Sequence, residues 1–193
     1  VGPALLWDTG TAYRLTFVRN ALGFVVRGLV LLRLPAVPPA PQRPPGETRL
    51  AVLRDTPYAL LAVLNMVMQL HIPILEVILP LWIALHTGAP HALTAVLLLL
   101  NTLACVGLQV PVTKKIDELR SAVRAFRVAG VALLGCCAAF ALSSGRGPWA
   151  ATVTLVVAAA LHVYGEMVQS AGSWVIGYEL APPTKQGQYQ GLF

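Results

Sequence analysis

Four long apolar stretches, separated by short polar connections, dominate this sequence from residue 58 onward. The hydrocarbon core of a bilayer is about 30 Å thick, and a helix needs about 20 apolar residues to cross it. Three of the stretches meet this length unaided, and the third along the chain meets it when its flanks, Ser121 to Ser144, are included. The sequence therefore predicts membrane-spanning helices at Tyr58–Leu85, Ala92–Val110, Phe126–Leu142 and Trp149–Ile176.

The basic residues of the connections alternate along the chain. The segment Arg33–Arg54 and the connection Thr113–Arg127 are both rich in Arg or Lys. The connection His86–His91 has no Lys or Arg, and Ser143–Pro148 has one. Loops rich in Lys and Arg remain on the cytoplasmic side of a membrane. We therefore predict that the two basic segments are cytoplasmic, and that the other two connections and residues 1–14 lie outside.

The composition excludes several classes of protein. Hydrophobic residues make up 56% of the chain and charged residues only 11%, whereas soluble domains have about a quarter of their residues charged. The net charge of +6 resides on the predicted cytoplasmic loops, so it sets topology and predicts no nucleic-acid partner. The sequence has no phosphate-binding glycine loop, metal-ligand motif or nucleophile triad. We therefore expect no enzyme activity, no cofactor and no metal.

Small residues inside the predicted spans are expected to serve packing. Cys105, Cys136 and Cys137 all fall in apolar surroundings without other metal ligands at suitable spacing, which argues against a disulfide framework or a metal site. Gly130 and Gly135 lie in the third stretch. Because glycine lets neighbouring membrane helices approach closely, these two positions are predicted to be helix contacts.

Residues Leu15–Leu34 form a fifth and weaker candidate span. The stretch is apolar in outline but contains Arg19 and Arg27. An arginine near the centre of a membrane helix costs about 2.5–3.5 kcal/mol on insertion scales. Insertion is therefore expected only if Arg27 faces protein and Arg19 reaches the interface, and an interfacial helix is the alternative. We favour a span, because the predicted orientation requires one.

Proline and charge divide the chain into three predicted parts. Pro35–Pro45 is rich in proline, which has no amide donor and a fixed φ angle, so this segment cannot be the interior of a helix. The predicted parts are residues 1–34 with one helix, a cytoplasmic linker at 35–55, and a bundle of four helices plus the start of a fifth at 56–193. Because the C-terminal residues resemble the first turn of a further helix, we expect the chain to be a fragment of a longer protein.

Polar side chains inside the spans gather in the first and last stretches. Those of each stretch are spaced so that they share one face of a helix. Intramembrane polar residues usually face a bundle interior or a water path, so the two stripes predict a shared polar cavity for a substrate or protons. The alternative is that they only join neighbouring helices by hydrogen bonds. The candidate pathway residues are Asn65, Gln69, Glu76, His162, Glu166 and Gln169.

Glu76 is the first candidate for a proton-coupling group, and Glu166 is the second. Glu76 lies between Pro73 and Pro80, which are expected to bend the helix and to free backbone carbonyl groups. Desolvation favours the neutral form of a carboxyl group, so such a group could bind and release a proton. His162, one helical turn before Glu166, could form a second relay or an ion pair with it.

Three sequence segments resemble one membrane-protein family. They are "VLLRLP" at Val30–Pro35, followed by the Pro/Arg-rich segment, "GQYQG" at Gly187–Gly191, and "GLQVPVTKK" at Gly107–Lys115. Together with the spans, they resemble the major facilitator superfamily, specifically a drug-exporter-like bacterial member. The resemblance implies that the chain covers the sixth helix to the start of the eleventh.

The loop after the second stretch resembles a cytoplasmic loop motif of that family. Gly107, Lys114 and Lys115 match it, whereas Pro111 stands where the family motif has Asp. This departure argues against a strong charge-pair gate in this half of the protein.

The resemblance implies an all-α, polytopic helical bundle with about five transmembrane helices in this chain. The family fold has two six-helix bundles that bind substrate between them at the midplane and rock to alternate access. The implied function is part of a secondary active transporter in the cell membrane, which moves a small organic solute or drug with coupling to protons. Its partners would be the lipid bilayer, that solute and protons. The alternative is a non-transporting polytopic protein, such as an assembly or sensor module.

Overall fold

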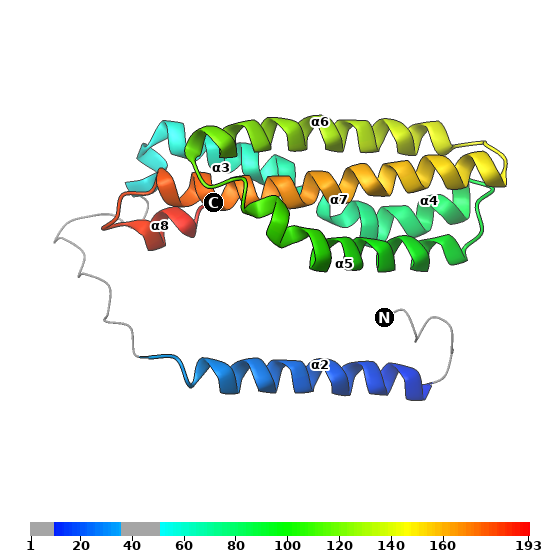
Figure 1. Ribbon diagram of the computed structural model, residues 1–193, viewed down its shortest axis with the longest axis horizontal. Helices are drawn as coiled ribbons and strands as arrows, with labels where there is room; N and C mark the ends of the chain where they lie inside the picture. The colour runs from blue at the N-terminus through cyan, green and yellow to red at the C-terminus, as the bar shows by residue number, and fades with distance from the viewer. Residues whose placement is uncertain (1–9, 36–50) are drawn as a thin grey trace. The chain divides into compact units, whose positions relative to one another are not determined.

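The computed structural model describes residues 10–35 and 51–193, and the regular structure of this part is entirely helical (Figure 1). The chain divides into two compact units, Val1–Gln42 and Arg43–Phe193. The first unit contains α2 (Gly10–Leu31). The second contains η1 (Ala51–Arg54), α3 (Thr56–Gln69), the π-helix η2 (Ile74–Ile78), α4 (Leu79–His86), α5 (Ala92–Thr113), α6 (Leu119–Ser143), α7 (Pro148–Glu179) and α8 (Gln186–Gln190). The predicted all-α fold is confirmed.

Four helical segments of the described residues are long and apolar enough to cross a membrane. They are Thr56–His86, Ala92–Thr113, Leu119–Ser143 and Pro148–Glu179, which confirms the four predicted spans. The fifth candidate forms helix α2 but is not among these four, so its crossing of the membrane stays a prediction. The N-terminal residues 1–9 and most of the predicted linker, residues 36–50, lie outside the described part.

The first span is not one continuous helix. α3 ends at Gln69, and Leu70 and His71 form a turn before the π-helix η2. Proline has no N–H group, so Pro73 cannot donate the helical hydrogen bond to the carbonyl of Gln69. A π-turn contains an extra residue compared with an α-turn and rotates everything that follows it. Asn65, before this turn, is buried, whereas Glu76, after it, is exposed. The sharing of one helix face by these two residues stays a prediction.

α7 is the central helix of the second unit, in contact with α5, α6 and α8. Two glycines of α7 set its close approach to α6. A Cβ atom at Gly172 would lie 3.0 Å from the backbone oxygen of Ala122, and one at Gly165 would lie 3.0 Å from Leu133 Cγ. A larger side chain at either position would have to push the helices apart, because packed interiors have little free volume.

The predicted packing roles of small residues in α6 are met in part. Gly135 is a helix contact, since a Cβ atom there would lie 3.3 Å from Leu161 Cδ1. Gly130 is not, because nothing lies within 4 Å of its Cβ position. Cys136 is fully buried in the apolar core, whereas Cys137 is exposed, so packing explains only the first of these two cysteines.

The apolar core of the second unit lies where η2, α4, α5, α6 and α7 meet. Its largest fully buried side chains are Leu79, Ile83, Leu97 and Leu155. Beside it, Trp82 Nε1 donates a hydrogen bond of 2.9 Å to Ser143 Oγ, which in turn donates to the carbonyl of Phe140. The α7 residues of this core lie in the first half of the helix, whereas His162, Glu166 and Gln169 lie further along it.

A polar cluster connects the two ends of the second unit. Tyr58 Oη donates to the backbone oxygen of Tyr189 at 3.0 Å, and Tyr189 Oη donates to Asp55 Oδ2 at 3.0 Å. Asp55 also caps α3, because its Oδ1 accepts a hydrogen bond from the backbone N–H of Tyr58. The start of α3 and the α8 segment are therefore joined.

Candidate functional site

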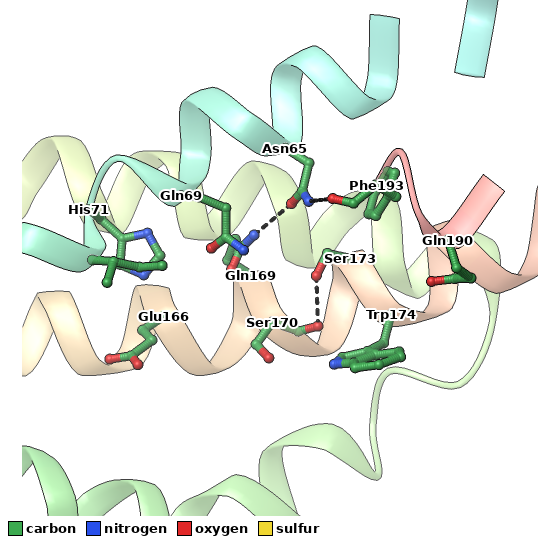
Figure 2. Close-up of a pocket in the computed structure, with 11 residues that line it drawn as sticks. Asn65, Gln69, His71, Glu166, Gln169, Ser170, Ser173, Trp174, Gln190 and Phe193 are labelled. Atoms are coloured by element: carbon green, nitrogen blue, oxygen red, sulfur yellow. Dashed lines mark hydrogen bonds between the residues drawn. The ribbon is translucent and has the colours of Figure 1, made fainter. Parts of the chain in front are cut away.

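A polar cavity of about 300 Å³ lies between α3 and α7, beside α8 (Figure 2). Four of the predicted pathway residues, Asn65, Gln69, Glu166 and Gln169, line this cavity. His162 lies buried behind it, in contact with His71. The other polar or aromatic lining residues include His71, Ser170, Ser173, Trp174, Gln190 and Phe193.

Two buried amides join the helices at this cavity. Gln169 Nε2 donates a hydrogen bond of 2.8 Å to Asn65 Oδ1, and Asn65 Nδ2 donates one of 2.8 Å to the carbonyl of Phe193. Both side chains are at most 3% exposed. A buried amide without a hydrogen-bond partner costs about 1–3 kcal/mol. Removing either of these side chains would therefore leave a polar group of the other unpaired. This pair fixes the spacing of α3 and α7.

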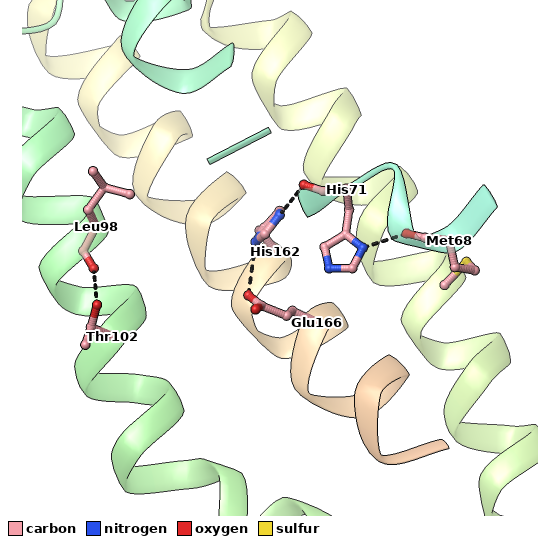
Figure 3. A network of polar contacts seen from close by, with 6 residues as sticks. All are labelled: Met68, His71, Leu98, Thr102, His162 and Glu166. Carbon is pink, nitrogen blue, oxygen red and sulfur yellow. Dashed lines mark hydrogen bonds and ion pairs between the residues drawn. The ribbon is translucent and has the colours of Figure 1, made fainter. Parts of the chain in front are cut away.

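The two imidazoles beside the cavity each donate to a backbone carbonyl (Figure 3). His71 Nδ1 lies 2.6 Å from the oxygen of Met68, and His162 Nε2 lies 3.1 Å from the oxygen of His71. A carbonyl oxygen only accepts hydrogen bonds, so these two nitrogens must carry hydrogen. The remaining nitrogens, His71 Nε2 and His162 Nδ1, have no hydrogen-bond partner among the described residues. In its neutral form, each ring would have one nitrogen that can accept a proton.

Glu166 lies next to one of these basic nitrogens. Its Oε2 is 3.8 Å from His162 Nδ1, one turn earlier on α7. The imidazole is 2% exposed, but the carboxyl side chain is 38% exposed and faces the cavity. A single proton can reside either on Glu166, facing the nitrogen lone pair, or on His162 as an ion pair with the carboxylate. The pair can therefore hold one proton where the cavity gives access to it.

Two residues of the cavity, His71 and Trp174, are among those outside the set of six candidate pathway residues. His71 is one of the polar residues of the first stretch, and the sequence favours a pathway role and a packing role for it about equally. Trp174, one turn beyond Ser170, adds an aromatic surface to the cavity. Glu76, in contrast, lies exposed on η2 and does not line the cavity, so its coupling role stays a prediction.

The chain was compared with known protein families, curated proteins and solved structures. The sequence model of the protein family Major Facilitator Superfamily matches residues 1–193, which is the whole chain. The chain belongs to the major facilitator superfamily. No curated protein and no solved structure matches it significantly. Membership in this superfamily, with four helices suited to a bilayer, makes the protein a multi-pass membrane transporter.

In this superfamily member, the residues of the predicted loop motif gather at the end of α5. Gly107 and Pro111 lie within α5, Lys114 caps it, and Lys115 follows. Gly107, Lys114 and Lys115 are all exposed. They occupy the end of the helix that the charge pattern assigns to the cytoplasmic side.

Proposed function

We propose that this chain is part of a proton-coupled secondary transporter for a small organic solute or drug, and that the α3–α7 cavity lies on its pathway. The observation that carries this proposal is the polar cavity itself, placed within two spans that are otherwise apolar. Amides, an aromatic ring and a carboxyl group line it. Such a lining suits a solute with an apolar body and a few hydrogen-bonding groups.

Glu166 and His162 are the proposed proton-holding pair. Intramembrane carboxyl and imidazole groups are costly and commonly serve proton relays. In this site the backbone carbonyl of His71 orients the His162 ring so that its free nitrogen faces Glu166. Loading a proton would neutralise Glu166, and releasing it would restore a negative charge in the cavity. The charge seen by a bound solute would change with each proton.

The alternative function, an assembly or sensor module, would use the polar residues only to join helices. The Asn65–Gln169 bond fits that role, because it joins α3 to α7. Glu166 and Gln69 do not, because they line the cavity and form no hydrogen bond to another helix among the described residues. Membership in a superfamily of transporters also favours transport.

Replacing Gln69 by Leu in the full-length protein tests this proposal. Gln69 is exposed to the cavity, so the change keeps the side-chain size and removes one hydrogen-bonding group from the pathway. We expect solute affinity to fall about three- to tenfold, the effect of losing one hydrogen bond. Binding of a panel of lipophilic drugs to the purified protein measures it. Gln109→Leu, on α5 and outside the cavity lining, is the matched control, and equal losses in both variants would contradict the proposal.

We also propose that the α5–α6 connection and residues 33–54 are cytoplasmic. Single cysteines introduced at Arg49 and at Gly88 are expected to react with an impermeant thiol reagent from opposite sides of the membrane. The native cysteines must first be replaced, above all the exposed Cys137. Labelling of both positions from the same side would show that this orientation is wrong.

A further inference from the structure

A second cavity lies at the other side of α7, where α5 ends and α6 begins. Its volume is about 470 Å³, and its walls come from α5, the α5–α6 connection, α6 and α7. It shares no lining residue with the α3–α7 cavity. The transport pathway proposed above does not use it.

Two cationic side chains face this second cavity. Lys115 and Arg124 both line it and are both exposed. Among the residues that the structure describes, neither forms an ion pair. Asp117 and Glu118 belong to the same connection but do not line the cavity, and the Glu118 side chain caps α6. Two positively charged side chains therefore lie at the mouth of the cavity without an ion-pair partner among the described residues.

The deeper walls of this cavity are apolar. Val128 lies four residues beyond Arg124 on α6, which is about 6 Å further along the helix axis. Val168 packs at that depth from α7, in the same apolar cluster as Ala125 and Ala129, and Leu108 closes the side formed by α5. The cavity thus runs from a cationic end, at the termini of two spans, to a largely apolar part within the spans, which Tyr164 also lines.

We infer that this cavity binds an anionic phospholipid of the cytoplasmic leaflet. Its phosphate group is placed between Lys115 and Arg124, and one acyl chain lies along Leu108, Val128 and Val168. Basic pockets between membrane helices on the cytoplasmic side bind acidic lipid headgroups, and the arginine fork matches phosphate geometry. A free phosphate would use only the cationic end and leave the apolar walls in contact with water. A phospholipid satisfies both ends.

Binding of phosphatidylglycerol to the delipidated full-length protein tests this site. Each basic side chain near a membrane surface contributes about a fivefold preference for an anionic lipid, so the double variant Lys115→Gln/Arg124→Gln is expected to bind about 25-fold more weakly. Native mass spectrometry measures the dissociation constant. Lys114→Gln/Arg120→Gln is the matched control, because it removes the same charge from exposed residues that do not line the cavity. This control is expected to retain wild-type affinity.

One further variant and two further ligands distinguish a lipid-binding site from non-specific attraction by surface charge. Val128→Trp fills the apolar part without a change in charge, and it is expected to weaken phosphatidylglycerol binding. Phosphatidylcholine and glycerol 3-phosphate are expected to bind the wild-type protein weakly. Equal losses in the two double variants would overturn the site, as would equal affinity for phosphatidylcholine. Tight binding of glycerol 3-phosphate alone would show a phosphate site instead of a lipid site. All variants are first required to bind solute as the wild type does, which shows that they are folded.

Discussion

Replacing Glu166 by Gln in the full-length transporter is expected to abolish proton-driven uptake and to leave solute exchange intact. Gln has nearly the size of Glu, and its amide can still donate to His162 Nδ1, so the packing of α7 is retained. The amide does not ionise, however, so the side chain at position 166 can no longer bind and release a proton. We expect uptake driven by a pH gradient to fall on the order of 100-fold, the lower range for removal of a positioned proton-transfer group. Proteoliposomes with an imposed pH gradient measure this loss.

Two further glutamates provide the controls for this experiment. Glu179→Gln changes an exposed residue at the end of α7 that does not line the cavity, and uptake is expected to continue. Glu76→Gln tests the other carboxyl group that the sequence predicts to couple protons. If proton-driven uptake stops in Glu76→Gln and continues in Glu166→Gln, then the coupling group lies on η2 and the proposal for Glu166 is wrong. If uptake stops in Glu166→Gln alone, the α3–α7 cavity contains the proton site.

The second large effect is expected from Gly172→Leu. A Cβ atom at Gly172 would already lie 3.0 Å from the backbone oxygen of Ala122, and this carbonyl belongs to helix α6 and cannot rotate away. A leucine must therefore separate α6 from α7, and such overpacking typically costs about 1–3 kcal/mol and occasionally more. The free energy of unfolding in a detergent titration measures the loss. We expect most of the variant protein to misassemble, because α7 contacts α5, α6 and α8 and is hydrogen-bonded to α3.

Gly130→Leu is the matched control for the packing effect. It introduces the same side chain on the facing helix α6, at a position where nothing lies within 4 Å of the Cβ atom. Stability is expected to stay near wild type or to rise slightly, because leucine favours a helix by about 0.8 kcal/mol over glycine. A loss in Gly130→Leu equal to that in Gly172→Leu would show that helix approach at Gly172 is not the cause.

The spans could be predicted from the sequence because apolar length and loop charge decide them locally. The predicted end of the last span, Ile176, lies three residues before the observed end of α7 at Glu179. The interruption of the first span could be predicted only in part. Pro73 marks where a helix is weakened, but the turn at His71 also depends on the hydrogen bond that its carbonyl accepts from His162. That partner lies 91 residues away in sequence, so no local pattern contains it.

The candidate site also depends partly on local sequence patterns and partly on contacts between residues distant in sequence. Helical spacing places Glu166 and Gln169 on one face of α7, and both line the cavity. Glu76 does not line the cavity, and a turn and the π-helix η2 interrupt the α-helical spacing between it and Asn65. The packing roles of the glycines also depend on contacts distant in sequence. Only the facing helix decides that Gly172 is a close contact and Gly130 is not.

The hydrogen bonds of α3 have a consequence for the order in which the bundle is made. Asn65 is bonded to Gln169, 104 residues later, and Tyr58 to Tyr189, 131 residues later. At roughly 5–20 residues per second, the ribosome needs roughly 5–20 s to deliver the first of these partners. During that interval an amide of α3 would be unpaired if the helix were already surrounded by lipid, where each such group costs several kcal/mol. The helix α3 can therefore complete its hydrogen bonds only after α7 and the α8 segment have been synthesised.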